Sequence, residues 1–305
     1  MEIRSNSVSV NNSNSAKEFE TYRGLIFGLA YRLLGSAMEA EDVVQETYLR
    51  YHSVPPTTIA SPRAFLTTIA TRLCLNQLQS ARVKRETYIG PWLPEPILTE
   101  TESDPYLVLT GDGKSSLQHE SISMAFLVLL EQLTPLERAV FLLREVFEYE
   151  YREIAEIIDK QESACRQLFS RAKKHIGENR PRFKPDQEAH HRLLEQFLRA
   201  VRLGDMDGLL RLLEDEVTFW ADGGGKARGA ATRPLHGREA VARFVIASTR
   251  LPVENYFVEI KEVNGEQGVI LRTEQRVIAV LLLEEEGGLI KTIRAIGNPD
   301  KLAGM

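Results

Sequence analysis

Residues 151–176, in the central part of the chain, read YREIAEIIDKQESACRQLFSRAKKHI. Its apolar spacing predicts a short helix over 151–158 and a longer, basic helix over 162–176. Asp159 suits the break between them, because aspartate tolerates left-handed backbone better than most residues. Two helices with so short a connection, the second of them basic, predict a helix-turn-helix.

The sequence on either side of this motif is also helical. Upstream, Thr134-Pro135-Leu136-Glu137 has the composition of a helix start, with Thr as cap and Pro in the first position. Further upstream, helical spacing over 17–34 and 38–51, and a start at Ser61-Pro62, predict three more helices. Residues 1–15 are rich in Ser and Asn, and we expect them to be disordered.

Charge is segregated along this half of the chain. Residues 63–85 contain five basic residues and no acid, 86–120 contain seven acids and one lysine, and 161–175 are basic again. The pattern fits solvated helix faces joined by a solvated tether. It also fits two nucleic-acid-binding helices, although the net charge of −5 argues against a protein that coats nucleic acid uniformly.

The side chains of the two N-terminal helices suit different partners. The basic helix over 63–85 offers donors for phosphates and for base edges. The helix over 38–51 is acidic, so it would repel DNA and could meet a basic protein surface. For each helix an ordinary solvated face is the alternative. The basic helix presents Arg72, Asn76, Gln79, Arg82 and Arg85.

After Pro185 the character of the sequence changes. Helices are expected over 189–203, 206–213 and 238–248, and strands over 217–220, 256–263, 269–273, 277–283 and 289–295. Helices followed by a run of strands predict an α+β domain.

Several classes of protein are excluded by composition. The 305 residues include two cysteines, Cys74 and Cys165, which suits a reducing compartment and a packing role. We find no signal peptide and no run of about 18 apolar residues, so we expect a cytoplasmic protein with no membrane partner. No residues have metal-ligand spacing, and we expect no metal and no cofactor.

Two motifs carry a resemblance to a known family. Residues 41–47, EDVVQET, resemble the core-polymerase-binding motif of extracytoplasmic-function (group IV) sigma factors, in their region 2. Residues 153–157, followed by the basic helix that contains Ser170-Arg171-Ala172-Lys173, resemble their region 4. Both motifs occur in the expected order and at the expected separation.

Three further motifs resemble one subgroup of that family, whose members carry a fused SnoaL-like C-terminal domain. The resemblance implies a multidomain chain with two all-α sigma domains and a C-terminal α+β cone. Region 2 would span 16–86 and region 4 would span 121–180, joined by an acidic linker over 87–120, and the cone would span 186–305. The motifs are Trp92-Leu93-Pro94-Glu95-Pro96, Asp222-Gly223-Gly224-Gly225-Lys226 and Asn298-Pro299-Asp300-Lys301-Leu302.

The family implies a dissociable specificity subunit whose partners are core RNA polymerase and promoter DNA. The helix over 63–85 would contact the −10 element, and the three subgroup motifs would make regulatory contacts that replace a separate anti-sigma factor. Core polymerase would be bound by Glu41, Asp42, Gln45 and Glu46. The −35 element would be bound by Arg166, Gln167, Ser170, Arg171, Lys173 and Lys174.

Two other functions stay open at this stage. Cone folds include enzymes that use Asp or His as an acid or base, and the candidates here are Asp222 and His236. Asp222 precedes three glycines and His236 precedes a helix start, so neither pattern indicates catalysis and we expect no catalytic residue. A helix-turn-helix repressor that senses an unknown small ligand in the cone is the other alternative.

Overall fold

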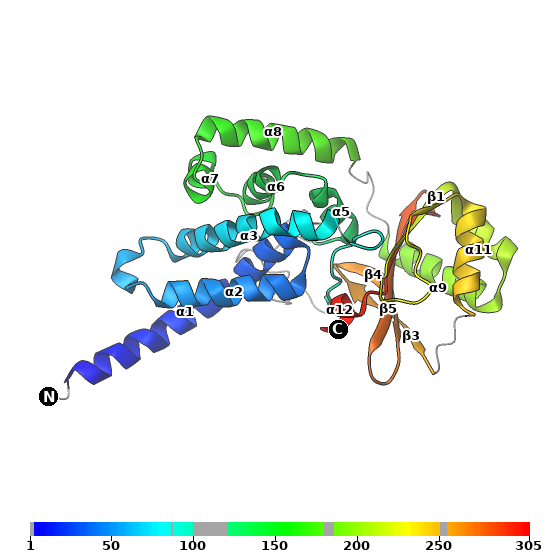
Figure 1. Ribbon diagram of the computed structural model, residues 1–305, viewed down its shortest axis with the longest axis horizontal. Coiled ribbons are helices and arrows are strands. Elements are labelled where there is room, and N and C mark those ends of the chain that lie inside the picture. Colours follow the sequence, from blue (N-terminus) through cyan, green and yellow to red (C-terminus); the bar gives the residue numbers. More distant parts are fainter. Residues whose placement is uncertain (1–2, 87, 100–120, 180–185, 251–254) are drawn as a thin grey trace. The chain divides into compact units, whose positions relative to one another are not determined.

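The computed structural model describes residues 3–86, 88–99, 121–179, 186–250 and 255–305 (Figure 1). The chain divides into two compact units. The first unit holds residues 1–83, 101–122 and 126–180, and the second holds residues 84–100, 123–125 and 181–305. No helix in the described ranges is both long and apolar enough to cross a membrane.

The N-terminal part of the first unit consists of three helices. Ser36 lies between the first two helices. It caps the second helix, because its side chain accepts a hydrogen bond from the Glu39 amide. The first helix begins at Ile3, within the segment 1–15 for which disorder was expected. Ser and Asn are weak helix formers, but the segment has no Gly or Pro to end a helix. The helices are α1 (Ile3–Leu34), α2 (Ala37–His52) and α3 (Pro62–Glu86), with a short 3-10 turn over Pro56–Thr58.

The second part of this unit contains the helix-turn-helix. Thr134 and Glu137 form the expected capping box at the start of α6. The expected break between the last two helices is confirmed, because Asp159 has φ 54° and ψ 57°, in the left-handed region. The helices are α5 (Met124–Glu131), α6 (Pro135–Phe141), α7 (Tyr151–Ile158) and α8 (Glu162–Asn179), with a π-helical turn over Leu142–Val146.

Two buried arginines join these two parts of the first unit. Arg138 donates from Nη1 to the carbonyl oxygen of Leu33 at 2.6 Å, which satisfies a free acceptor at the end of α1. Arg32 donates from Nε to Ser121 Oγ at 2.8 Å. Burial lowers the pKa of Arg32 to about 9 and that of Arg138 to about 10. The helices before and after residues 100–120 are therefore packed as one body.

The second unit is the expected α+β domain. A six-stranded sheet has the order β2-β1-β6-β5-β4-β3, in which β1 and β6 are parallel and the other neighbours are antiparallel. In Figure 1, α9 and α11 cover one face of this sheet. The elements are α9 (Gln187–Leu203), α10 (Met206–Leu212), β1 (Leu213–Asp222), β2 (Leu235–His236), α11 (Arg238–Ser248), β3 (Phe257–Val263), β4 (Glu266–Arg272), β5 (Val277–Glu286), β6 (Leu289–Ile296) and α12 (Pro299–Leu302).

Apolar side chains fill the space between the helices and the sheet. Leu194 and Phe197 of α9 pack with Phe219 of β1 and Ile293 of β6. Sequence periodicity placed the start of β1 four residues too late and missed β2, which pairs at only two positions, Thr218 with His236 and Phe219 with Leu235.

Residues 88–99 form part of the second unit, and this differs from the expected linker over 87–120. Ile97 accepts a hydrogen bond from the Asn264 amide, and Leu98 makes a β-bridge with Val263. These backbone bonds attach the segment to the end of β3. The rest of the expected linker, residues 100–120, lies outside the described residues.

Candidate functional site

The acidic helix α2 presents the residues expected to bind core polymerase. Asp42 and Gln45 are exposed, while Val43, Val44 and Thr47 bury the opposite face. Of the two remaining predicted residues, Glu41 lies 2.6 Å from Arg23 Nη2, and Glu46 lies 2.7 Å from Arg50 Nε.

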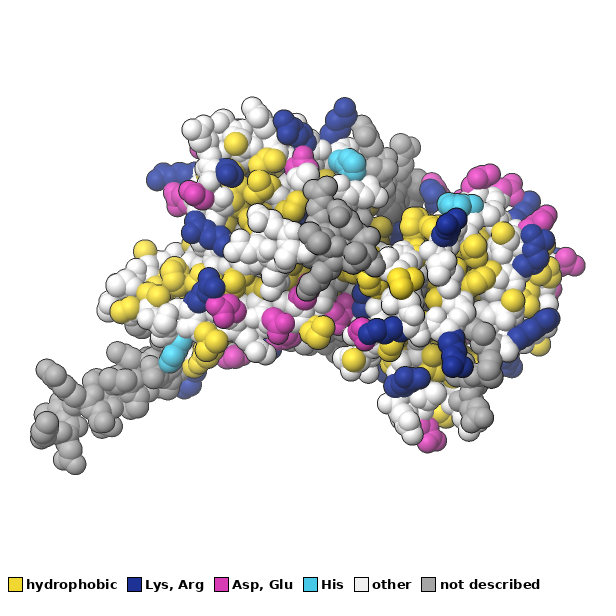
Figure 2. Space-filling view, in the orientation of Figure 1, with side chains coloured by type: hydrophobic (Ala, Val, Ile, Leu, Met, Phe, Trp, Pro, Cys, Tyr) yellow, Lys and Arg dark blue, Asp and Glu magenta, His cyan; other side chains and the backbone are white. Residues whose placement is uncertain are grey.

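The helix-turn-helix presents the residues expected at the −35 element. Figure 2 shows basic side chains over α8 and acidic ones over α2. Cys165, Ala172 and Ile176 bury the inner face of α8. On the outer face, Arg166 pairs with Glu162 and lies over the Tyr151 ring at 4.5 Å, and Lys173 lies 3.8 Å from Glu145. Gln167, Ser170, Arg171 and Lys174 are also exposed.

One of the residues predicted to contact the −10 element makes contacts within the protein instead. Arg72 of α3 donates from Nε to the carbonyl oxygen of Ile157 at 2.9 Å and from Nη2 to that of Glu156 at 3.1 Å. Both acceptors lie at the end of α7, the first helix of the helix-turn-helix. Asn76 and Gln79 are exposed, and the side chains of Arg82 and Arg85 lie outside the described part of the structure.

Two further contacts on the same side of α3 were not anticipated. Thr67 and Tyr149 share a buried hydrogen bond of 2.7 Å between their hydroxyl oxygens. Arg63 donates to the carbonyl oxygen of Phe147 at 3.1 Å and lies over the Tyr149 ring at 5.0 Å. Together with Arg72, these residues hold α3 against the helix-turn-helix half of the unit. We call the contacts of Arg63, Thr67 and Arg72 the α3 lock.

The second unit brings the three subgroup motifs together around one buried carboxylate. Asp222 has no exposed surface and lies at the end of β1. Its Oδ2 accepts from the Leu93 amide at 2.8 Å and lies 2.7 Å from Lys301 Nζ. Its Oδ1 accepts from the Tyr88 hydroxyl at 2.5 Å. Asp222 belongs to the second motif, and it is bonded to Leu93 of the first motif and to Lys301 of the third.

The neighbours of this carboxylate complete a network that we call the Asp222 clamp. Lys301 Nζ lies 4.0 Å from the centre of the Trp92 ring, at cation–π distance, and it also donates to the Leu93 carbonyl oxygen. Asn298 donates from Nδ2 to the Tyr88 hydroxyl at 2.7 Å and caps α12. Burial and the adjacent Asp222 raise the pKa of Tyr88, which keeps its hydroxyl a donor. The clamp consists of Tyr88, Trp92, Leu93, Asp222, Asn298 and Lys301.

The other motif residues surround the clamp. Pro94, Glu95, Pro96 and Leu302 are buried, whereas Pro299 is exposed. Gly224 has φ +57°, and a Cβ there would lie 2.4 Å from Asn298 Nδ2, so the clamp requires glycine. Gly223 is buried and Gly225 lies against Ile89. Lys226 and Asp300 form an exposed ion pair of 2.5 Å at the edge of the network.

Sequence reasoning missed Tyr88, although it is the hydroxyl that links Asp222 with Asn298. The only signal was its place four residues before Trp92, and one aromatic residue beside a motif does not indicate a buried donor. Burial raises the pKa of the thiols of Cys74 and Cys165, in keeping with the packing role expected for both.

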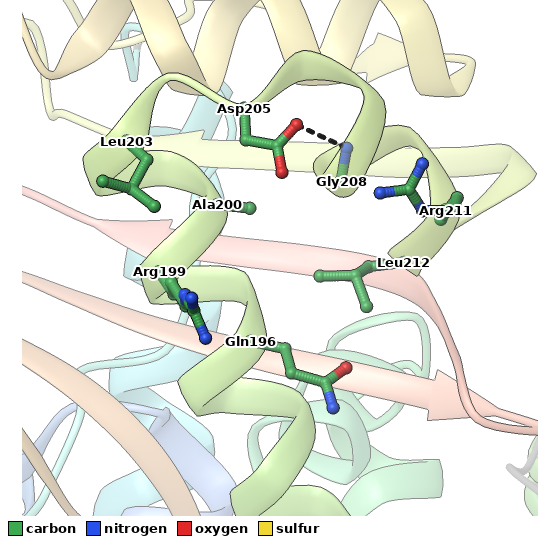
Figure 3. Close-up of a pocket in the computed structure, with 8 residues that line it drawn as sticks. All are labelled: Gln196, Arg199, Ala200, Leu203, Asp205, Gly208, Arg211 and Leu212. Carbon is green, nitrogen blue, oxygen red and sulfur yellow. Dashed lines mark hydrogen bonds between the residues drawn. The ribbon is translucent and has the colours of Figure 1, made fainter.

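The two residues considered for catalysis, Asp222 and His236, have different surroundings. Asp222 is buried and accepts from three donors, and His236 is exposed beside Thr218 on β1. A hollow of about 430 Å³ lies between α9 and α10, with Arg199 and Arg211 on its two sides (Figure 3). Its polar lining side chains are exposed, so it is a surface hollow outside the packed core. A ligand inside the cone stays a prediction.

Comparison with known proteins agrees with this architecture. The family model for sigma-70 region 2 matches residues 19–83, and the family model for sigma-70 region 4 matches residues 123–176. The extracytoplasmic-function sigma factor SigJ of Mycobacterium tuberculosis is 36% identical over 301 residues, which cover 94% of this chain and 93% of SigJ. The chain belongs to the extracytoplasmic-function sigma factor family.

A second relative and a solved structure show a similar likeness over most of the chain. A probable extracytoplasmic-function sigma factor of the same organism, SigI, is 29% identical and covers 93% of each chain. The crystal structure of SigJ superposes with a TM-score of 0.72 at 33% identity, and covers 95% of this chain and 98% of that one. These relatives are named as RNA polymerase sigma factors. The sigma-factor interpretation is therefore favoured over the enzyme and repressor alternatives.

Proposed function

We propose that this sigma factor is controlled in cis by its C-terminal α+β domain, in place of a separate anti-sigma factor. The Asp222 clamp is the observation that carries the proposal. Three motifs, of which the first and the last lie about 200 residues apart along the chain, meet at one buried carboxylate. A buried charge is costly unless it is paired and hydrogen-bonded, so this arrangement holds the 88–99 segment with a defined geometry.

The position of that segment gives the clamp a way to act on DNA binding. Tyr88 follows the last residue of α3, Glu86, by two positions. Attaching residues 88–99 to the cone therefore restrains the exit of the helix that is expected to contact the −10 element.

The α3 lock makes the described conformation a closed one. Arg72 satisfies two carbonyl groups at the end of α7, so it must leave them before it contacts a promoter. The two promoter elements lie apart on DNA, and engaging both requires α3 and the helix-turn-helix to separate. We propose that the clamp favours the closed form and that assembly with core polymerase opens it.

The exposed residues of the first unit form the surfaces for the two partners, core RNA polymerase and promoter DNA. We propose that Asp42 and Gln45, flanked by Glu41 and Glu46, bind a basic surface of core RNA polymerase in the cytoplasm. The outer face of α8 would enter the major groove at −35. Arg166, Gln167 and Ser170 would contact bases or the nearest phosphates, whereas Arg171, Lys173 and Lys174 would contact phosphates.

Run-off transcription with purified core polymerase tests this function. The full chain is compared with a chain ending near residue 200, on the same genomic template. Specific transcripts that differ in amount between the two chains support a sigma factor controlled by its own C-terminal domain. Equal amounts overturn the control in cis, and no specific transcript from either chain overturns the promoter-directing role. Binding of both chains to core polymerase is the control for folding.

A further inference from the structure

Two arginines lie over the ring of one tyrosine at the start of α7. Tyr151 is the first residue of that helix. The guanidinium carbon of Arg166, on α8, lies 4.5 Å from the centre of the Tyr151 ring. That of Arg144, on the π-helical turn before α7, lies 5.0 Å from the same centre. Both distances are within the range of a cation–π interaction, so the ring connects α8 with the turn that precedes α7.

The Tyr151 ring is held in turn by other aromatic side chains. It makes a T-shaped contact with Phe169 of α8, with ring centres 5.9 Å apart and an angle of 75° between the planes. Phe169 stacks at 6.0 Å on Phe141 of α6, which is buried. Aromatic pairs are favourable at such distances and angles. Tyr151 is therefore a fixed surface against which a flexible side chain can lie.

Two contacts restrain the side chain of Arg166. Its Nη2 lies 2.5 Å from Glu162 Oε1, one turn earlier on α8, and its guanidinium group lies over Tyr151. A long side chain loses conformational entropy when it is immobilised at an interface, and a side chain that is already restrained loses less. The side chain of Arg166 is still 60% exposed. The two contacts therefore orient the guanidinium group and leave it accessible to DNA.

We propose that Tyr151 is a positioning residue for promoter recognition, which sets the orientation in which Arg166 contacts a base pair of the −35 element. This inference rests on the function proposed above for α8. Arg166 is the fifth residue of α8, and the N-terminal residues of the second helix of a helix-turn-helix contact base edges. Arginine forms two parallel hydrogen bonds with guanine, and these require a defined orientation of its planar group. Tyr151 and Arg166 together therefore favour a base pair that contains guanine.

Filter binding of the holoenzyme, on a promoter found by run-off transcription and on its single-base-pair variants at −35, tests the proposal. Arg166→Ala identifies the base pair whose discrimination depends on Arg166. Tyr151→Leu removes the aromatic face but keeps an apolar side chain against Phe169. It should lower discrimination at that base pair by about two- to fivefold, the size of an exposed cation–π contact. Tyr151→Phe keeps the ring and should behave like the wild type.

The double variant separates positioning from a general effect on the fold. Tyr151→Leu should change discrimination no further once Arg166→Ala is present, because the side chain that it positions is gone. Tyr151→Met takes the place of the leucine variant if that chain does not bind core polymerase.

The matched control is Arg144→Ala, which removes the other cation from the same ring and should leave discrimination at −35 unchanged. Discrimination that falls with Arg166→Ala but not with Tyr151→Leu overturns the positioning role alone. Discrimination that is unchanged by Arg166→Ala overturns the role proposed for Arg166, and the positioning role with it. An equal fall for Tyr151→Phe and Tyr151→Leu also overturns the proposal, because the hydroxyl group and not the ring would then be responsible.

Discussion

Lys301 Nζ lies 2.7 Å from Asp222 Oδ2, and the two side chains are 12% and 0% exposed. The ammonium group also lies over the Trp92 ring, so one cation connects the C-terminal motif to the other two. Removing one partner of a buried ion pair leaves the other charge uncompensated. Changes at either of these two residues should therefore strongly lower the stability of the clamp.

Lys301→Met should lower the free energy of unfolding of the second unit by about 3–5 kcal/mol. The substitution leaves the Asp222 carboxylate buried without its cation. Adding Asp222→Asn should recover part of this loss, because the double variant buries no net charge. Urea unfolding of the full chain measures both changes.

Lys226→Ala is the matched control for that experiment. It breaks the exposed pair with Asp300, which is worth about 0–1 kcal/mol. If Lys301→Met lowers the free energy of unfolding no more than the control does, the buried pair does not hold the clamp.

The turn of the helix-turn-helix depends on left-handed backbone at Asp159. Asp159→Val should lower the free energy of unfolding of the first unit by about 1–2 kcal/mol, since a β-branched residue is disfavoured at φ 54°. Asp159→Gly adopts this conformation freely and should stay close to the wild type. Equal losses for the two variants in thermal unfolding would contradict the role of backbone conformation here.

Phosphate contacts by α8 should appear in the salt dependence of promoter binding. Arg171→Ala and Lys174→Ala should each reduce the slope of log K against log salt by about 0.9, on any promoter sequence. Gln167→Ala should change the preference among −35 sequences and leave the slope unchanged. Filter binding of the holoenzyme over a salt series distinguishes these outcomes, and unchanged slopes for both basic variants would remove α8 from the DNA interface.

The α3 lock gives two variants opposite effects on transcription. Tyr149→Phe removes a buried hydrogen bond to Thr67, worth about 1 kcal/mol, and should shift the closed–open equilibrium about fivefold toward open. Its run-off output should rise. Arg72→Ala also opens the lock but deletes a predicted −10 contact, so its output should fall. A fall for both variants would mean that the lock supports the active form.

Local signals in the sequence predicted local structure well. The capping box at Thr134 and the left-handed turn at Asp159 depend on neighbouring residues, and both are confirmed. Arg72 was correctly placed on an outer helix face, but its partners are backbone carbonyl groups 84 and 85 positions away. A carbonyl acceptor has no side-chain signature, so no pattern near Arg72 indicates this contact.

The clamp was not predicted from the sequence. The three motifs were expected to make regulatory contacts, but no pattern indicated that they meet at Asp222. In the structure it is a buried strand residue with three donors. The assignment of Tyr88 to the network depends on burial and on the approach of α12, which is contributed from 210 positions away.

The most direct test of control in cis is run-off transcription from a single promoter, at saturating core polymerase, with four full-length chains. These are the wild type, Trp92→Ala, Tyr88→Phe and the control Lys226→Ala. Our account predicts that Trp92→Ala and Tyr88→Phe, which loosen the clamp, give more transcript than the wild type, and that Lys226→Ala gives the same amount. Equal transcript from all four chains, with each shown to be folded, would contradict it.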